Sequence, residues 1–402
     1  MQRLFSRDRF GRPQILAGLL LLAFVAECLW LVAHIPPGAV SSEEFTRVQE
    51  GLAQCNGKSI AGIPSASGGG SADVNIRGND YDPDHSPLWY LIEAAPLAIF
   101  GLDLTSTAGI WLSRLPYVVI GTLLGASLWY VSRRLYGNVG GYIALGLYCF
   151  SPAVIRSSVL WFVQPNIAGA WGTFGAVFTG IAVSHTLYAP REVILWNWRR
   201  ILLLAISLVL AVGSRFSLAI VLPVLLALML YVAWERRAAV TAIFFASSGI
   251  GAFLLLLTYR SQWKTFGHGL AHAKWIEVSG PALAMSRVWW LVFREMAESG
   301  PVLVLLAPAA LLGYALWRRP RYFGNTAPLV VAILFIGLRA GSPHETDSVF
   351  GLIAVVFLFL FIAGIAADCL ETRFREVVAA VMAGLLAANA IWNLVGMAKI
   401  RL

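Results

Sequence analysis

Long apolar segments follow one another along most of this chain, and they restrict the folds open to it. A helix needs about 20 residues to cross a bilayer, and inside the hydrocarbon every backbone N–H and C=O must find a partner within the protein. We count about eleven such segments, which predict an all-α polytopic membrane protein with about eleven transmembrane helices. The predicted spans are Gln14–His34, Ala108–Ser132, Val139–Val159, Ile167–Leu187, Ile201–Gly213, Phe216–Tyr231, Ala238–Leu257, Pro301–Trp317, Ala327–Leu338, Val349–Ala367 and Val377–Met397.

The composition agrees with this class and argues against a nucleic-acid partner. The 402 residues are 58% hydrophobic and 13% charged, and we expect residues 1–402 to form a single integral membrane domain. The formal net charge is +9, but Lys and Arg occur mostly in short clusters between apolar segments, as topology signals do. The four cysteines are far apart and have no CxxC spacing, so they indicate neither a zinc site nor a disulfide framework.

The positive clusters predict the orientation of the chain. Pairs such as Arg133-Arg134, Arg199-Arg200 and Arg318-Arg319 fall on the side of the arginine-rich N-terminus, which we interpret as cytoplasmic. We interpret the first span as a retained helix, because its apolar run is too long for a signal peptide. Residues 41–102 then form the first extracytoplasmic loop, with interfacial helices, and residues 258–300 form the second.

The apolar stretch Leu88–Phe100 lies within the first of these loops. It is too short to cross a bilayer and is interrupted by Glu93 and Pro96. We therefore expect an amphipathic helix at the outer interface, with Trp89 and Tyr90 at the headgroups.

The first loop is also richer in acids than a connector needs to be. A long loop with many titratable groups suggests a functional site. Its carboxylates and histidine are Glu43, Glu44, Glu50, Asp73, Asp80, Asp82, Asp84, Glu93 and His85.

The order of several short motifs resembles one enzyme class. An arginine-flanked first span is followed by paired acids, a His-Pro-Pro-Leu-like box at His85-Ser86-Pro87-Leu88, and Arg114-Leu115-Pro116 entering a span that closes on Arg133-Arg134-Leu135-Tyr136-Gly137. This order resembles the GT-C class of polyprenyl-phosphate-sugar-dependent glycosyltransferases. It is similar in particular to the protein O-mannosyltransferase and aminoarabinose-transferase branch, from about Arg3 to Phe216.

The resemblance implies roles for individual residues. Glu43 or Glu44 would be the catalytic base, and Arg215 in Gly213-Ser214-Arg215-Phe216 would hold the lipid phosphate. Where the family commonly has a second acid, this chain has Asn166, which cannot act as a base, so we expect no metal and no cofactor. The expected substrate-binding residues are Asp82, Asp84, His85, Asn166, Arg215 and His344.

The chemistry of sugar transfer needs the same residue types. A carboxylate deprotonates the acceptor hydroxyl, and a cation stabilises the phosphate that leaves. We favour Glu44 over Glu43 for the first task, with a solvated helix N-terminus as the alternative for both. For the loop acids the alternative is an Asp-rich turn. For Arg215 and Arg156 the alternative is an arginine that reaches out to the headgroups.

The sequence thus predicts a hexosyl- or pentosyltransferase of GT-C type in a bacterial inner membrane, with its site facing outward. Its partners would be a polyprenyl-phosphate-linked sugar, an acceptor lipid, glycan or protein, and membrane lipids, with no nucleic acid. A transporter or lipid flippase is one alternative, which predicts internal symmetry and charged residues at mid-span. A non-catalytic membrane scaffold is the other, which would explain the missing second acid.

Overall fold

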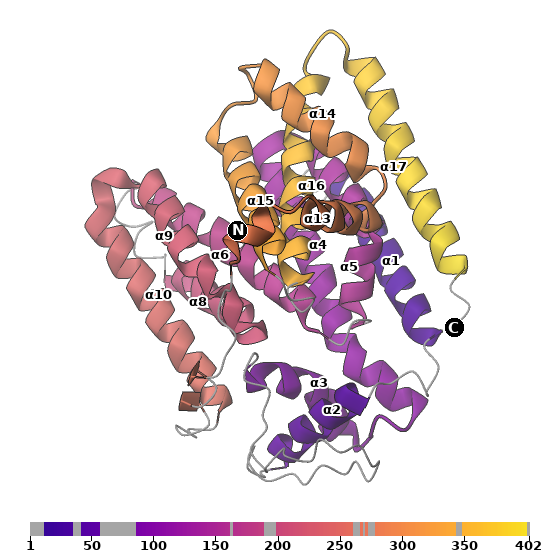
Figure 1. Cartoon of the computed structure of the whole chain (residues 1–402), viewed down its shortest axis with the longest axis vertical. Helices are drawn as coiled ribbons and strands as arrows, with labels where there is room; N and C mark the ends of the chain where they lie inside the picture. The colour runs from indigo at the N-terminus through magenta and orange to yellow at the C-terminus, as the bar shows by residue number, and fades with distance from the viewer. Residues whose placement is uncertain are drawn as a thin grey trace. The chain divides into compact units, whose positions relative to one another are not determined.

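The computed structural model describes residues 12–34, 42–56, 86–160, 164–188, 198–259, 266–267, 270–271, 278–342 and 348–399. Over these residues the chain forms helices and turns and no strand, which confirms the all-α prediction. The helices are α1 (Arg12–Ala33), α2 (Ser42–Cys55), α3 (Pro87–Phe100), α4 (Thr107–Cys149), α5 (Pro152–Ser158), α6 (Asn166–Thr186), α8 (Trp198–Ser214), η3 (Phe216–Ile220), α9 (Val221–Val232), η4 (Trp234–Arg236), α10 (Arg237–Thr258), α12 (Gly280–Leu283), α13 (Ser286–Ser299), α14 (Leu303–Leu316), α15 (Phe323–Gly341), α16 (Ser348–Leu370) and α17 (Arg375–Ala398) (Figure 1).

The chain divides into two compact units, each made of segments that are distant in sequence. The first unit comprises Met1–Leu31, Val118–Phe162 and Val278–Leu402. The second comprises Val32–Tyr117 and Val163–Glu277.

Helix α16 is the core of the first unit. It is apolar on every side and almost wholly buried, as expected for a helix enclosed by other helices. It packs against α13, α14, α15 and α17 (Figure 1). At Gly364 a side chain would collide with Asn325 and Tyr136, so a small residue is what lets these helices approach. The outer helix α17, by contrast, leaves most of its surface exposed.

The second unit is built on the pair α6 and α8. A side chain at Gly172 would collide with the backbone of Ala211, and one at Gly175 would collide with Ser207. The contact moves forward along α6, from Gly172 to Gly175, and backward along α8, from Ala211 to Ser207. The two helices are therefore antiparallel. Helix α8 also packs against α10 and α3, and α3 packs against α2.

All eleven predicted spans coincide with helix, but eleven membrane crossings are not confirmed. Seven helices are long and apolar enough to cross a membrane, or eight if α13 and α14 count together as one bent span. Helix α4 holds the second predicted span and the start of the third as two helices that reverse direction at Gly137 (φ 75°), a backbone conformation that glycine adopts without strain. The Tyr148 hydroxyl donates to the Gly121 carbonyl at 2.5 Å, so the two halves of α4 lie antiparallel, and the third span continues into α5. Helices α8 and α14 have 17 and 14 residues, fewer than a straight crossing needs.

The helix predicted within the first loop is present, but its aromatic residues are not at a surface. Helix α3 spans Pro87–Phe100, with Pro87 at its first turn and Gly101 as a left-handed C-cap. Trp89 and Tyr90 are 1% and 0% exposed, so placing them at the headgroups was wrong. The physical reason is Gly51 on α2, whose missing side chain lets α2 lie directly against the Tyr90 backbone and cover this face of α3.

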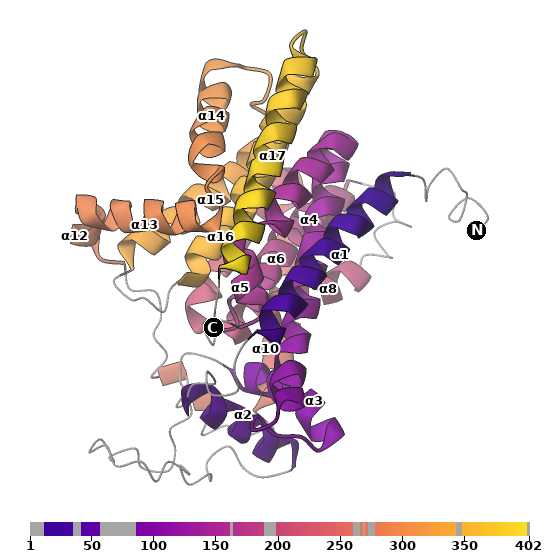
Figure 2. The same ribbon diagram turned by 90° about the vertical axis from the view of Figure 1, so that its right-hand side faces the viewer.

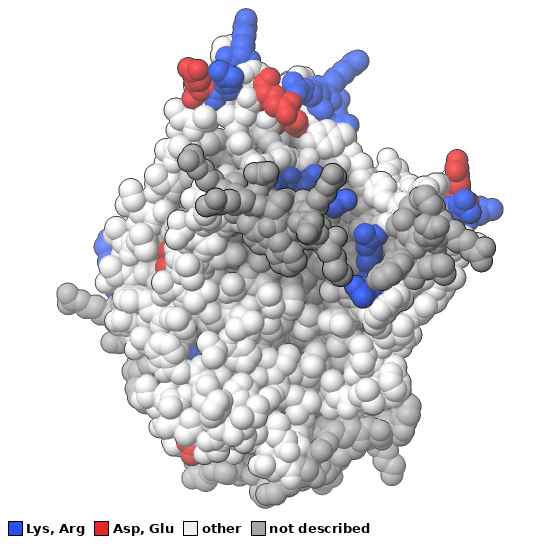
Figure 3. Space-filling model, turned by 180° about the vertical axis from the view of Figure 1, so that it is seen from behind, with Lys and Arg blue, Asp and Glu red and all other residues white. Residues whose placement is uncertain are grey.

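Charged side chains are sparse among the described residues on the face of the molecule drawn in Figure 3. On the face drawn in Figure 3, the described Lys, Arg, Asp and Glu gather toward the top and one side of the view, and uncharged residues form most of the rest. Many of the exposed side chains are large and apolar, for example Leu22, Phe253 and Leu312. Such a surface suits helices that face lipid.

Candidate functional site

The candidate site lies in the second unit, where the helical path breaks at Arg215. Helix α8 ends at Ser214, Arg215 is extended (φ −162°, ψ 128°), and the chain continues as η3. The end of a helix leaves carbonyl groups without partners in the helix. The Gly213 carbonyl accepts two hydrogen bonds from Ser86, one from the backbone N–H at 3.0 Å and one from the hydroxyl at 2.8 Å. The break at Arg215 is therefore tied to the residue that follows His85.

Ser86 occupies the position at which this chain departs from His-Pro-Pro-Leu. Proline has no N–H and no hydroxyl, so a proline there could make neither bond to Gly213. Gly213 is equally specific, since a Cβ atom there would lie 3.0 Å from the Ser86 hydroxyl and 3.2 Å from Leu88 Cδ2. The serine and the glycine together allow the box to dock on the end of α8.

The Arg215 side chain points into the protein. It is 4% exposed, and its backbone N–H donates to the Ala211 carbonyl at 3.3 Å. An arginine that reached out to the headgroups would be exposed, so this burial does not support that alternative. Placing an arginine away from water costs roughly 2.5–3.5 kcal/mol on insertion scales, which makes Arg215 a candidate for binding an anion.

Asn166 belongs to the same end of the helix pair. It is the first residue of α6 and is buried. Because α6 and α8 are antiparallel and Gly172 lies against Ala211, the start of α6 lies at the end of the pair where α8 stops. The structure thus brings Asn166, Arg215 and the Ser86 end of the box to one end of the α6–α8 pair.

Glu44 is paired with an arginine that sequence reasoning placed in a motif but not in the site. Arg114 Nη2 lies 2.7 Å from Glu44 Oε1 and 3.0 Å from Oε2, and both side chains are 3% exposed. Burial raises the pKa of Glu44, and the charge and hydrogen bond of Arg114 oppose that rise. Glu44 is therefore not the solvated helix N-terminus that was the alternative, because its carboxylate is buried and held by a cation.

A second buried acid lies on α3. Glu93 is 1% exposed and accepts a hydrogen bond from the indole N–H of Trp89. Burial raises its pKa to about 8, a rise that the Trp89 bond opposes and the nearby Glu44 charge increases. The Arg47 guanidinium lies 4.6 Å from the centre of the Trp89 ring, which joins α2 to this group. At neutral pH Glu93 is mostly protonated and can donate a hydrogen bond.

Several predicted site residues lie outside the described part of the structure. These are Asp82, Asp84, His85, His344 and the side chain of Glu43. Within the described residues no group of three His, Cys, Asp or Glu side chains is arranged to hold a metal ion.

Sequence reasoning missed Arg114 and Glu93 as members of the site. A signal was available for both, because an ionisable residue within an apolar segment needs a partner or a change of charge. Arg114 falls inside the predicted span Ala108–Ser132, and Glu93 interrupts Leu88–Phe100. The sequence could not show that Glu44 is the partner of Arg114, since 70 residues separate them.

Comparisons with known proteins show the fold and not a family. No protein-family model matches the chain, and no curated protein sequence matches it. The chain is similar to crystal structures of the oligosaccharyltransferase of Archaeoglobus fulgidus. The apo form is 12% identical, with a TM-score of 0.55 over 96% of this chain and 54% of that one. The form tethered through a disulfide bond to an acceptor peptide containing the NVT sequon is 15% identical, with a TM-score of 0.51 over 80% of this chain and 48% of that one.

This chain therefore spans about half the length of the protein it resembles. At such low identity the likeness shows a shared fold.

Proposed function

We propose that this chain is an integral membrane glycosyltransferase that moves a sugar from a polyprenyl-phosphate donor to an acceptor on the outer face of the membrane. The observation that carries the proposal is the docking of Ser86 on Gly213, two residues before the buried Arg215. This contact joins the His85–Leu88 motif of the first loop to Arg215, the residue that the order of the motifs predicts to bind the donor phosphate. The fold shared with an oligosaccharyltransferase supports the same class of reaction.

In this proposal Arg215 binds the phosphate of the donor. A guanidinium presents a planar fork of N–H donors that matches phosphate oxygens. As the acceptor oxygen bonds to the anomeric carbon, the bond from that carbon to the phosphate oxygen breaks, and charge grows on the phosphate. A cation fixed beforehand in a buried position stabilises that charge in the transition state.

The acceptor proton goes to a carboxylate of α2 in this proposal. Glu44 is our candidate, and its neighbour Glu43 is the other. The leaving phosphate is a weak base, so the reaction needs no general acid and one carboxylate suffices. The presence of Asn166 in place of a second acid is therefore compatible with catalysis. The pair with Arg114 adds a structural task for Glu44, because it positions the carboxylate. Asp82, Asp84, His85 and His344 remain candidates for binding the sugar or the acceptor.

The finer identity of the reaction is also part of the proposal. We place the enzyme in the protein O-mannosyltransferase and aminoarabinose-transferase branch, in a bacterial inner membrane with the site facing the exterior. The acceptor class is open to lipids, glycans and proteins. A peptide is one candidate, since the related oligosaccharyltransferase has been captured with an acceptor peptide.

The experiment that tests the proposal measures transfer and donor binding by the full chain in nanodiscs, with a panel of radiolabelled polyprenyl-phosphate sugars. We expect transfer from at least one donor. Arg215→Ala should weaken binding of that donor by roughly ten- to a hundredfold, because a charge-assisted contact to phosphate is lost. Arg215→Lys should keep part of the affinity, since a lysine retains the charge without the fork.

Arg319→Ala is the matched control. It also removes one arginine, but Arg319 is exposed and paired with Glu371, so its variant should bind donor as the wild type does. Equal donor affinity for the wild type and Arg215→Ala would remove Arg215 from the site. Failure to transfer any sugar in the panel would favour the scaffold, and movement of the intact donor across the bilayer would favour a flippase.

A further inference from the structure

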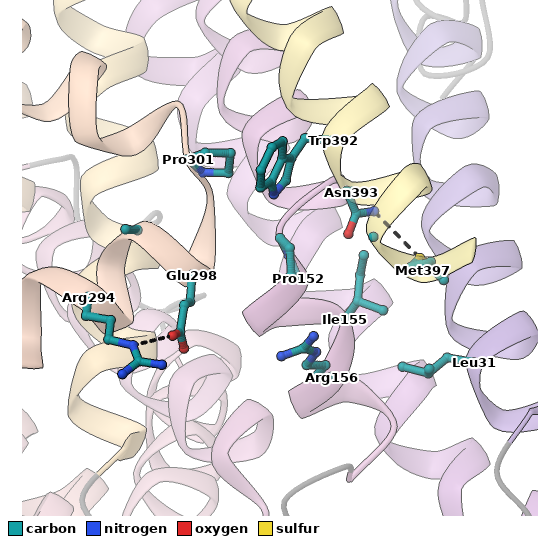
Figure 4. Close-up of a pocket in the computed structure, with 12 residues that line it drawn as sticks. Leu31, Pro152, Ile155, Arg156, Arg294, Glu298, Pro301, Trp392, Asn393 and Met397 are labelled. Carbon is teal, nitrogen blue, oxygen red and sulfur yellow. Dashed lines mark hydrogen bonds and ion pairs between the residues drawn. The ribbon is translucent and has the colours of Figure 1, made fainter. Parts of the chain in front are cut away.

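The first unit contains a pocket of about 570 Å³ whose walls come from α1, α5, α13, α17 and Pro301, which lies between α13 and α14. Its size lies in the range of small-molecule sites. Part of the wall is apolar and is formed by Leu31, Ile155 and Met397 (Figure 4). Arg156, Arg294 and Glu298 also line it, so the pocket combines a hydrocarbon surface with ionic groups.

Positive charge prevails among the residues that line the pocket. Arg156, at the end of α5, is half-buried, and over the described residues its guanidinium has no hydrogen bond or ion pair. Figure 4 shows it between Leu31 and the pair formed by Arg294 and Glu298, in which Nε and Oε1 are 2.8 Å apart. Two arginines and one glutamate leave one net positive charge. The cation that accounts for it is Arg156.

One acid close to the pocket is already engaged. Asn393 lines the pocket and donates its amide N–H to Glu27 Oε2 at 2.8 Å. Glu27 is buried and is not itself part of the wall. Arg156 lines the pocket, and no acid of the described part of the chain is paired with it.

Helix α13 suggests that the pocket opens at the level of lipid headgroups. Its outer face exposes Trp289, Trp290 and Phe293, and tryptophan is enriched where membrane meets water. The chain then bends by 108° into the apolar α14. Figure 2 shows α13 lying across the direction of α17. A helix of this kind lies along the interface, which is where phosphate groups are.

We propose that this pocket binds the phosphate group of a membrane phospholipid. Arg156 donates hydrogen bonds to the phosphate oxygens, and one hydrocarbon chain runs along Leu31, Met397 and the exposed ring of Trp392. The apolar wall explains why the ligand is an amphiphile, and the net charge explains why its headgroup is anionic. This inference does not depend on the glycosyltransferase proposal.

The test is native mass spectrometry of the full chain, purified in detergent and titrated with phosphatidylglycerol. We expect one equivalent to bind in an Arg156-dependent way. Arg156→Gln should weaken that binding by roughly ten- to a hundredfold, and Arg156→Lys should recover part of it. Arg319→Gln, which removes an exposed arginine outside the pocket, should bind like the wild type. Thermal unfolding of each variant shows whether it is folded.

Two further measurements distinguish binding of a whole phospholipid from binding of a phosphate ion alone. Trp392→Ala removes an exposed ring from the wall and should weaken phosphatidylglycerol binding without unfolding the protein. Inorganic phosphate in excess should compete poorly, because it has no chain for the apolar wall. Equal phosphatidylglycerol binding by folded Arg156→Gln and wild type would overturn the proposal. Inorganic phosphate competing as well as the lipid would replace the phospholipid site by a free-anion site.

Discussion

The two units of this protein differ in where their ion pairs lie. In the second unit, Glu44 and Arg114 are paired with both side chains 3% exposed. In the first unit the described pairs are more exposed, from Arg339 and Glu295 at 13% and 38% to Arg294 and Glu298 at 68% and 58%. Its buried hydrogen bonds include one between neutral groups, from the Ser151 hydroxyl to the Ser299 carbonyl at 2.5 Å, and one from the Asn393 amide to the buried Glu27 at 2.8 Å.

This difference suggests that the buried ion pair of the second unit serves a function other than helix packing. Burying an ion pair costs more desolvation energy than an apolar pair of the same size, so a buried pair is weak evidence for stability. Hydroxyl and amide bonds between helices are enough to hold a membrane bundle together. The second unit carries charges that packing alone does not require, and this is where the candidate site lies.

The largest expected effect is on turnover. Glu44→Gln keeps the shape of the side chain but removes the proton acceptor, so turnover should fall about 10²–10⁴-fold with donor binding little changed. Glu43→Gln should be milder, because neighbouring residues of a helix point in different directions. EDTA should leave wild-type activity in place. Steady-state kinetics would contradict the assignment if both glutamine variants were fully active, and abolition of activity by EDTA would indicate a metal enzyme.

The second prediction separates the base from a purely structural partner. Arg114→Met leaves Glu44 buried without its cation and should destabilise the protein by about 3–5 kcal/mol. Arg319→Met breaks an exposed pair with Glu371 and should cost less than about 1 kcal/mol. Both are measured by thermal unfolding in detergent.

The double variant Glu44→Gln, Arg114→Met sharpens this test. It leaves no uncompensated charge, so it should regain much of the stability that Arg114→Met loses. If Glu44 is the base, turnover should stay low in the double variant. Recovery of both stability and turnover would show that Glu44 only balances Arg114.

The third prediction concerns pH and Glu93. Its pKa is about 8 in the folded protein against an ordinary value of 4.5, so between these values the folded state holds a proton that the unfolded state has lost. The stabilisation is complete below pH 4.5 and is lost as pH rises through 8. Unfolding free energy should fall by roughly 2–4 kcal/mol from pH 5 to pH 8. Glu93→Gln, which still accepts the Trp89 hydrogen bond, should reduce the dependence of unfolding free energy on pH. If that dependence were unchanged, groups other than Glu93 would cause it.

The smallest expected effect compares one hydroxyl in each unit. Ser86→Ala and Ser151→Ala each remove one side-chain hydrogen bond to a carbonyl and should each cost about 1 kcal/mol of stability. Only Ser86→Ala should also lower transfer, because only Ser86 is tied to the break at Arg215. Equal transfer by the two variants would show that the contact with Gly213 is packing alone.

The location of the helices was readable from the chain because helix formation in a membrane is a local property. The backbone N–H and C=O groups of each apolar segment form hydrogen bonds within that segment, and its own sequence sets its length. Each of the eleven predicted segments accordingly falls on helix. The number of crossings was less readable. It depends on breaks such as the 108° bend between α13 and α14, which hydropathy does not register.

The order of the motifs predicted the GT-C class and the site residues Glu44, Asn166 and Arg215 before any geometry was known, and these remain predictions. The long-range contacts around them were decided by tertiary structure. Ser86 meets Gly213 across 127 positions, and Arg114 meets Glu44 across 70. Such contacts depend on where small residues let helices approach, as Gly51 does when it brings α2 onto α3 and buries Trp89 and Tyr90. Hydrophobic pattern specifies that a residue is buried, but only the packing of distant helices specifies what it is buried against.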